Sequence, residues 1–514
     1  MTAGREPKPG RGPLVVFVAA AVAGVALSAN VASGRPILAS RWSLLGELGL
    51  WGVAWLIAVA AAFRLPRRAA LLLILGAGLA VRLAGLAGPP ATSDDLYRYS
   101  WDGRVQAAGL DPYAQAPDSG QLVRLRESWL WPDAAGCATL DRGAGCTRIN
   151  RPSDRTIYPP VAEAWFAAAY RVGGIGSRHK LWQVAGLLTE LATLGLLPIA
   201  LRRFGGDVRW TALYALCPAP VLEIVNNGHV DGLGVVFTVA ALLVLAPPPT
   251  SVARLPDWAR DVLAGLLLGA AALVKLYPAL VLVAVVGTGR GRRLPALLRA
   301  GVTAGALTAL TYLPHVVSVG PKVLGYLPGY LREEHYRGGG RFLIAGALGV
   351  PASLAGVASV LGVTAVIVWV LVRRPPAPVG AAALLGAVFL ATSPVQPWYA
   401  VSLLALATIA RRPWWGAVVV AGYPYFFAVI LDYRHTVGLG RAVYLAALVA
   451  VVTAAVAPRL ARRPVTPYPP EAPTPVAVPG GANDSPETGS DAVRVSHAVA
   501  RAAWALASRS TSST

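Results

Sequence analysis

The stretch AALLLILGAGLAVRLAGLA, residues 69–87, is followed after one glycine by PPATSDDLYRYSWDGRVQAAGLDPY, residues 89–113. The first segment is long and apolar enough to cross a hydrocarbon core of about 30 Å as a helix. The second segment is polar and carries two adjacent carboxylates, Asp94 and Asp95, where the chain would leave the bilayer. Together they predict a membrane protein with acidic groups at one membrane surface.

The composition extends this prediction to the whole chain. Of the 514 residues 55% are hydrophobic and only 14% are charged, which is too apolar for an ordinary soluble enzyme of this length. Apolar runs of about 17–25 residues recur between residues 14 and 457. Backbone groups in lipid must be paired within their own segment, so these runs predict an all-α polytopic fold.

The formal net charge of +21 comes mostly from arginines in the short joints between apolar runs. This pattern is typical of cytoplasmic loops and of contact with acidic lipid, and it argues against a nucleic-acid partner. Lysine is rare and occurs only at Lys8, Lys180, Lys275 and Lys322.

The arginine joints orient the predicted spans, and both termini fall in the cytoplasm by the positive-inside rule. About fourteen passes are expected, with spans at 14–32, 44–63, 69–87, 181–201, 210–225, 231–246, 296–314, 353–372, 379–393, 399–410, 414–431 and 438–457. The run 262–287 is expected to form two short helices that meet near Lys275, because a single span would place Arg290, Arg292 and Arg293 outside. The stretch 158–174 is expected to lie as a helix in the membrane interface.

This threading divides the chain into three parts. Residues 1–13 form a cytoplasmic N-terminus, residues 14–457 a transmembrane domain, and residues 458–514 a disordered cytoplasmic tail rich in Pro, Ser, Thr and Gly. Within the tail, DAVRVSHAVARAAWALASR could form an amphipathic helix on the membrane surface. The transmembrane domain carries two large exterior loops, 88–180 and 315–341.

Ionisable and other polar side chains collect on the exterior side of this threading. Because such groups cost about 2–3 kcal/mol or more each near lipid, the gathering predicts a site at the outer membrane surface. The group consists of Asp94, Asp95, His229, Asp231, Lys275, Glu333, Glu334, His335, Gln396, Tyr399, Asp432, Arg434 and His435.

Several of these residues also have a purely structural interpretation. Thr92 and Asp95 could form a capping box for the helix LYRYSWDGRVQAAG, and Lys275 could extend to the interface. His229 and Asp231 could be ordinary polar residues of a turn, and the cluster 333–335 a solvated loop. The aromatic residues Trp398, Tyr399, Tyr423 and Tyr425 could anchor the interface.

Two of the three cysteines share the first exterior loop. Cys137 and Cys146 can form a disulfide if that loop faces an oxidising exterior, and the loop lacks the further ligands that a metal site requires. Cys217 lies in an apolar run and is expected to be a small core residue.

The order of five motifs resembles the GT-C superfamily of membrane glycosyltransferases. The motifs are SDDLYRYSWDGRVQAAGLDPY, TIYPPVAEAWFA, NNGHVDG, AGLLLGAAALVKLYPAL and SPVQPWY, within residues 70–410. The chain is most similar to the actinobacterial mannosyltransferases that use polyprenol-phosphate-mannose. This resemblance implies a GT-C-like bundle of about 13–14 transmembrane helices, with interfacial helices in the first exterior loop.

The resemblance also implies a reaction. Such enzymes move a sugar, here mannose, from a polyprenyl-phosphate donor to a lipid-linked or cell-envelope glycan acceptor on the outer face of the plasma membrane. The anomeric centre is inverted, and the resemblance makes Asp94 or Asp95 the general base. Lys275, with His229 and Arg434 as helpers, would bind the donor phosphate. Candidate substrate-binding residues are Asp231, Tyr158, Gln396, Tyr399, Glu334 and His335; no cofactor or metal ion is expected.

Two other functions remain open at this stage. A transporter or lipid flippase would place polar residues on broken helices near the bilayer midplane in roughly symmetric halves. A scaffold without chemistry is the third alternative, because the similar enzymes often have His at the position of Gln396 and His-Pro at that of Arg151-Pro152.

Overall fold

The computed structural model describes residues 11–33, 42–174, 176–247, 255–288, 293–336 and 339–460. The chain divides into two units, Met1–Arg459 and Leu460–Thr514, and the description below concerns the first. The predicted tail and its amphipathic helix lie outside the described residues, as do most of residues 1–13.

The described residues form α-helices, short 3₁₀ segments and one π-helix, with no strand among them. The all-α polytopic prediction is confirmed. Within the described ranges, eight helices are long and apolar enough to cross a membrane, or nine if a bent pair is one span, and four shorter apolar helices accompany them. The longer helices are α1 (Arg11–Val31), α2 (Trp42–Ala62), α3 (Arg67–Gly85), α7 (His179–Arg203), α11 (Arg293–Val319), α14 (Ala352–Arg373), α17 (Gly416–Ile430) and α18 (Thr436–Leu460).

The shorter apolar helices and the connecting segments complete the chain. The apolar ones are α9 (Asp231–Leu245), η4 (Tyr277–Thr288), α15 (Ala377–Ala391) and α16 (Pro397–Ala410). The rest are α4 (Asp95–Ala107), η1 (Gly120–Leu125), α5 (Ala134–Thr139), α6 (Pro160–Gly173), η2 (Val208–Trp210), α8 (Thr211–Ala215), η3 (Pro220–Asn226), α10 (Asp257–Ala272), η5 (Gly320–Leu324), α12 (Leu327–Glu333), α13 (Leu343–Ala347) and η6 (Pro413–Trp415).

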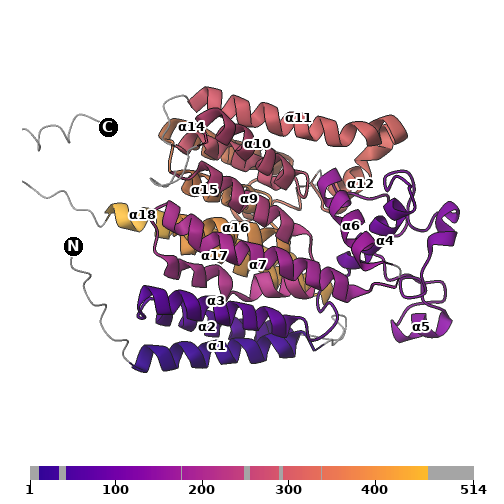
Figure 1. Ribbon diagram of the computed structural model, residues 1–514, viewed down its shortest axis with the longest axis horizontal. Helices are drawn as coiled ribbons and strands as arrows, with labels where there is room; N and C mark the ends of the chain where they lie inside the picture. Colours follow the sequence, from indigo (N-terminus) through magenta and orange to yellow (C-terminus); the bar gives the residue numbers. More distant parts are fainter. Residues whose placement is uncertain are drawn as a thin grey trace, which may run out of the picture. The chain divides into compact units, whose positions relative to one another are not determined.

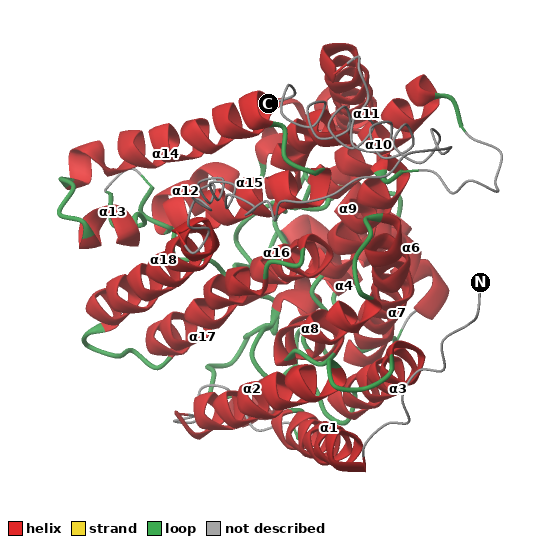
Figure 2. Cartoon of the chain, turned by 90° about the vertical axis from the view of Figure 1, so that its left-hand side faces the viewer, coloured by secondary structure: helices red, strands yellow, loops and turns green. Residues whose placement is uncertain are grey.

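The long helices run side by side, and α4, α5 and α6 lie together beyond one end of them (Figure 1). The centre of the bundle is α16, which contacts α7, α8, α9, α15 and α17 (Figure 2). Nearly every residue of α16 is buried, as expected of a helix that is apolar on all sides. Its first turn begins at Pro397, at the same end of the bundle as α4 and α6.

Small residues let some helices approach closely. A Cβ atom added at Gly265 of α10 would lie 2.5 Å from the backbone oxygen of Ala300 in α11. Membrane helices use such positions because lipid offers no hydrophobic drive for association and close van der Waals contact must replace it.

The predicted span 210–225 is wrong as a single helix. It is broken into α8 and the π-helical segment η3, which are bent by 63° relative to each other. Pro218 and Pro220 fall at the break, where a proline ring cannot continue the helical hydrogen bonding. Arg82 of α3 donates to the freed carbonyl oxygen of Ala215 at 2.6 Å.

The second exterior loop, 315–341, is more helical than its sequence suggests. Helix α11 carries Pro314 in its interior and continues to Val319, and η5 and α12 follow within the predicted loop. The two helices predicted within 262–287 are present as α10 and η4, and they are separated by the residues around Lys275.

Candidate active site

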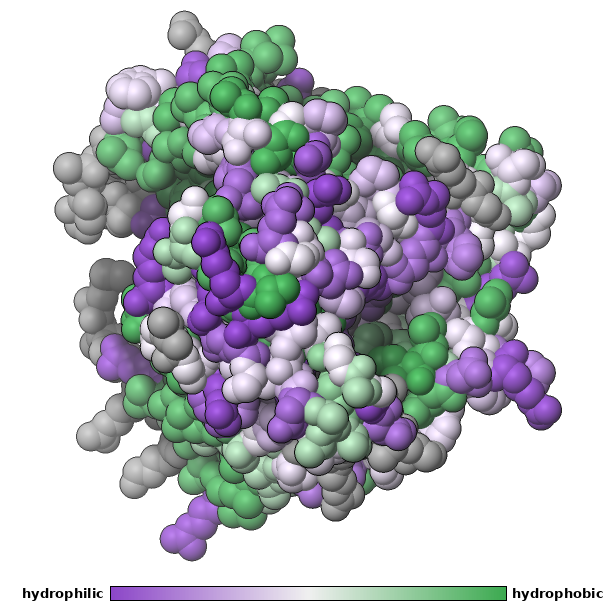
Figure 3. Space-filling model, turned by 90° about the vertical axis from the view of Figure 1, so that its right-hand side faces the viewer, coloured by the Kyte–Doolittle hydropathy of each residue, from purple (hydrophilic) through white to green (hydrophobic). Residues whose placement is uncertain are grey.

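A cavity of ≈ 880 Å³ lies at the end of the bundle that carries α4 and α6. Figure 3 shows this end as a largely hydrophilic face with apolar side chains at its margins. The polar lining includes Asp94, Asp95, Asn150, Tyr158, Lys275, Tyr330, Glu334, Arg341, Gln396 and Tyr399. The apolar lining includes Leu276, Leu280, Leu324, Leu327, Val388, Phe389, Phe426 and Ile430.

The two adjacent carboxylates stand at the beginning of α4 and share one donor. The side-chain nitrogen Nδ2 of Asn150 donates to Oδ1 of Asp94 at 2.9 Å and to Oδ1 of Asp95 at 2.7 Å. The second oxygen of Asp95 accepts a long hydrogen bond, 3.4 Å, from the hydroxyl of Tyr158. Burial, reinforced by the charge of Asp95, raises the pKa of Asp94 above its ordinary value.

The capping-box interpretation of Thr92 and Asp95 is wrong. The N-cap of α4 is Asp94, whose side chain makes no capping hydrogen bond. The hydroxyl of Thr92 instead accepts from Nδ2 of Asn227, in the turn before α9. The long-range contact to Asn227 therefore displaces the local cap, and both carboxylates remain at the cavity.

Behind the carboxylates, α4 and α6 form a rigid support that we call the platform, residues 95–173. A Cβ atom at Gly103 would lie 2.5 Å from the backbone oxygen of Phe166, so glycine allows the two helices to touch. Thr156 donates to Oε1 of the buried Glu163 at 2.6 Å, and Gln106 donates to Oε2 at 2.8 Å. Burial, together with the charge of Asp102, raises the pKa of Glu163 well above its ordinary value.

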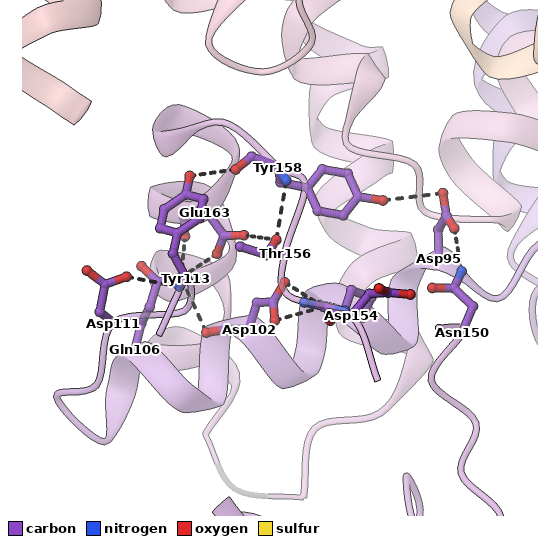
Figure 4. Close-up of polar contacts among 11 residues, drawn as sticks. Asp95, Asp102, Gln106, Asp111, Tyr113, Asn150, Asp154, Thr156, Tyr158 and Glu163 are labelled. Carbon is purple, nitrogen blue, oxygen red and sulfur yellow. Dashed lines mark hydrogen bonds and ion pairs between the residues drawn. The ribbon is translucent and has the colours of Figure 1, made fainter. Parts of the chain in front are cut away.

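The platform fixes the position of Tyr158. The hydroxyl of Tyr113 donates to the backbone oxygen of Tyr158 at 2.6 Å, and the ring of Tyr158 packs edge-on against Phe166. Figure 4 shows Thr156, Glu163 and Tyr113 gathered on one side of Tyr158, whose hydroxyl points to Asp95. The same network thus supports a residue that contacts the carboxylate pair.

Lys275 lies in the break between α10 and η4 and lines the cavity. Its Nζ atom lies 4.7 Å from the ring centroid of Tyr158 and 5.1 Å from that of Tyr399. The ammonium is thus held over two aromatic faces, which attract a cation through their quadrupoles. Lys275 thus faces the cavity, and its role in binding the donor phosphate stays a prediction.

His229 and Asp231 lie behind the cavity wall. His229 is 1% exposed, and its Nε2 atom lies 3.0 Å from Oγ of Ser93. Asp231 is also buried and accepts a hydrogen bond from the hydroxyl of Tyr277 at 3.1 Å. Neither residue lines the cavity, so the structure places both in the layer next to the predicted substrate contacts.

Gln396, Tyr399 and Glu334, the candidate substrate-binding residues, line the cavity, and Arg341 joins them. Arg341 is 4% exposed, forms an ion pair with Glu334 and donates through Nε to the backbone oxygen of Thr392 at 3.2 Å. Sequence reasoning missed Arg341, although it is the last residue of the second exterior loop, 315–341.

Arg434 and His335 lie outside the cavity lining and are exposed. Arg434 belongs to the turn between α17 and α18, and His335 follows α12 with a positive φ of 55°. Glu333 forms an ion pair with Arg151 at the surface. For this residue, the interpretation of the cluster 333–335 as a solvated loop therefore holds. Arg151 is thus a contact between the first exterior loop and α12, and it also lines the cavity.

The two loop cysteines are paired. Cys137 and Cys146 form a disulfide with a Cα–Cα distance of 5.8 Å, and Cys217 is free and buried, as the sequence predicts. In the described part of the chain, no group of three or more His, Cys, Asp or Glu side chains could hold a metal ion.

Part of the chain is similar to a known protein family. Residues 157–394 match the model of glycosyltransferase family 87. The matched segment contains Tyr158, His229, Lys275 and Arg341, whereas Asp94 and Asp95 precede it. The match indicates glycosyltransferase activity, which requires a sugar donor and an acceptor. Comparisons with curated proteins and with solved structures found no match.

Proposed function

We propose that this chain is a polyprenyl-phosphate-sugar-dependent glycosyltransferase of the plasma membrane. It transfers a hexose, mannose by the sequence resemblance, to a lipid-linked or cell-envelope glycan acceptor on the outer face. The anomeric centre is inverted, and an aspartate acts as the general base.

One observation carries this proposal: a single cavity is lined by a carboxylate pair, by cationic side chains and by an apolar wall. A polyprenyl-phosphate sugar combines a sugar, a phosphate and a long hydrocarbon chain. The apolar side chains of Leu276, Leu280 and Phe389 line the same cavity as Lys275, so one ligand can present its hydrocarbon chain to the former and its phosphate to the latter. Apolar walls with a few convergent polar groups are typical of ligand sites.

Asp95 is the base in this proposal. The rise in the pKa of Asp94 favours its protonated form, whereas Asp95 faces Tyr158 and His229 with its second oxygen. Asp95 takes the proton of the acceptor hydroxyl as that oxygen attacks the anomeric carbon of the donor. A positioned base of this kind contributes about 10²- to 10⁴-fold in rate.

Lys275 and Arg341 act on the leaving group. The bond from the anomeric carbon to the phosphate oxygen breaks, and its electron pair adds negative charge to the polyprenyl phosphate. Cations held in place by Tyr158, Tyr399 and Glu334 stabilise that charge without reorganising during the reaction.

The exterior location of the cavity is supported by the arginines at the other end of α3. This helix begins at Arg67 and ends at Gly85, shortly before α4. A separate hollow of ≈ 500 Å³, lined by Arg67, Arg68 and Arg202, lies at its beginning. The positive-inside rule places that end in the cytoplasm and the platform outside, where its disulfide would be stable.

Topology is testable by cysteine labelling in intact cells. Ser153 is exposed in the first exterior loop and Arg68 is exposed at the arginine-lined end. We expect a membrane-impermeant maleimide to label Ser153→Cys but not Arg68→Cys until the membrane is permeabilised. The wild-type chain is the blank, since Cys217 is buried. The opposite labelling pattern would place the active site in the cytoplasm and refute the proposal.

The reaction is tested with the full chain in proteoliposomes and synthetic polyprenyl-phosphate sugars, after lipid-linked sugars have been profiled in membranes with and without the chain. We expect one donor to be consumed and its sugar to reach an acceptor.

A transporter or flippase is the second candidate function. The helices are broken between α8 and η3 and at Lys275, and broken helices are typical of transport sites. Sugar uptake or lipid scrambling without transfer would favour that candidate.

A further inference from the structure

A chain of buried polar groups leads from Asp95 away from the cavity. His229 lies in the turn between η3 and α9. One of its ring nitrogens faces the carboxylate of Asp95, and the other faces the carboxylate of Glu223. Nε2 lies 3.7 Å from Oδ2 of Asp95, and Nδ1 lies 3.4 Å from Oε2 of Glu223. Nδ1 also lies 2.9 Å from the backbone oxygen of Glu223, an acceptor that requires a proton on Nδ1.

Glu223 is also buried and accepts hydrogen bonds from its neighbours. It is 1% exposed, in the π-helical segment that follows the proline break. The hydroxyl of Tyr423 donates to its Oε1 at 2.9 Å, and Nδ2 of Asn227 donates to its Oε2 at 3.1 Å. Both carboxylate oxygens therefore accept hydrogen bonds, which fix the orientation of the Glu223 side chain.

The surroundings of His229 favour its cationic form. Burial by itself lowers the pKa of His229, but the hydrogen bond to Glu223 and the charges of Asp95, Glu223 and Asp231 together raise it above the ordinary value. These are the charged groups that face the imidazole from α4, η3 and α9; Lys275 lies next to Asp231 on the cavity side.

The cavity does not reach the imidazole. The indole of Trp398 lines the cavity and stacks on His229, with ring centroids 4.2 Å apart and the planes at 21°. The stacking both covers His229 and favours a cation at that place. A direct contact between His229 and a donor phosphate, which the sequence resemblance implies, does not fit this arrangement.

We propose that Glu223 and His229 form a buried positioning pair for Asp95, rather than a phosphate-binding site. Glu223 holds the imidazole of His229 in place, and His229 in turn holds Asp95 oriented toward the acceptor hydroxyl. This inference rests on the proposed function, because it assigns the pair to the general base of that reaction.

The pair makes a specific kinetic prediction. Removal of the cation opposite Asp95 lets that carboxylate keep a proton to higher pH, so the acid limb of the kcat profile moves to higher pH. The donor KM should stay within a factor of about two, since the pair does not contact the donor. The loss in kcat should be smaller than the roughly 10²- to 10⁴-fold that loss of the base itself costs.

The experiment compares His229→Gln, Glu223→Gln and the double variant with the wild-type chain in proteoliposomes. We expect both single variants to show the shifted acid limb, and the double variant to be little worse than either, because the two residues act as one unit. His315→Gln is the matched control, since His315 also pairs with a carboxylate, Asp111 at 3.0 Å, outside the cavity lining.

Two other outcomes would overturn the proposal, and a third would show that the proposed function itself has failed. A raised donor KM with an unmoved acid limb would overturn the proposal in favour of a phosphate contact. Unchanged kinetics in folded variants would also overturn it. Thermal unfolding in detergent identifies variants that fail to fold, and the more conservative His229→Asn and Glu223→Asp variants then supply the measurement. Absence of transfer by the wild-type chain would instead mean that the proposed function has failed.

Discussion

The side-chain nitrogen of Asn150 lies 2.7 Å from Oδ1 of Asp95 and so ties the middle of the first exterior loop to the first residue of α4. The same nitrogen contacts Asp94 at 2.9 Å. Two neighbouring carboxylates repel each other when both are ionised. Asn150 therefore holds the pair in one geometry by donating to both.

Replacing Asn150 by alanine should impair catalysis more than folding. A hydrogen bond to a charged group contributes about 1.5–3 kcal/mol, so kcat should fall by about 10- to 100-fold. Initial rates in proteoliposomes measure this loss. Gln115→Ala removes another loop amide, which forms hydrogen bonds with Gln121 and Ser119, and should leave the rate unchanged. Equal rates for the Asn150 variant and the wild-type chain would show that the contact is dispensable.

Replacing Lys275 by methionine should remove charge stabilisation from the leaving phosphate. Loss of one preorganised group of this kind costs about 10²- to 10³-fold in kcat. Lys275→Arg should retain part of the rate, because it keeps the cation. Lys322→Met, at an exposed position of η5, is the control. If the methionine variant of Lys275 kept the full rate at every donor concentration, the phosphate would be bound elsewhere.

Replacing Arg82 by methionine should destabilise the bundle at its proline break. Arg82 and Glu190 are both fully buried, with Nη2 2.6 Å from Oε2, and the loss of one partner leaves a buried charge at a cost of about 3–5 kcal/mol. Chemical unfolding in detergent micelles measures the loss. The double variant Arg82→Met with Glu190→Gln should recover stability, and its failure to do so would contradict this explanation. The exposed pair Arg67–Asp207 should contribute only about 0–1 kcal/mol.

The platform should lose stability as the pH rises, because of Glu163. Burial raises the pKa of Glu163 well above its ordinary value of 4.5, so the folded chain holds a proton that the unfolded chain releases. This stabilisation is complete below the ordinary value and is lost as the pH rises through the folded-state value. The melting temperature of wild type should fall over that range, and Glu163→Gln should fall less. Parallel pH profiles for the two proteins would mean that Glu163 titrates normally.

The apolar helices and the break at Lys275 could be predicted because they depend on local properties. The length of an apolar run and the position of the arginine joints are visible in the sequence, and both follow from the cost of burying charge and backbone in lipid. Asp94, Asp95 and Lys275 could be placed at one end by the same reasoning.

The details of the site depend on contacts between distant segments, which the sequence does not display. Asn150 lies 55 residues from Asp95, and Glu223 lies inside an apolar run that looks like an ordinary span. Sequence reasoning also selected Arg434 and His335, because topology indicates which end a residue occupies but not whether its side chain faces the cavity. Pro218 and Pro220 are the signal in the sequence that marks the break between α8 and η3.

The most direct test of the central claim is sugar transfer by the wild-type chain and by Asp95→Asn, reconstituted at equal amounts in proteoliposomes. The account predicts transfer from a polyprenyl-phosphate sugar by the wild-type chain. It predicts a loss of about 10²- to 10⁴-fold in Asp95→Asn without loss of folded protein, and a smaller loss in Asp94→Asn. Transfer by the Asp95 variant at the wild-type rate would contradict the assignment of this carboxylate as the base.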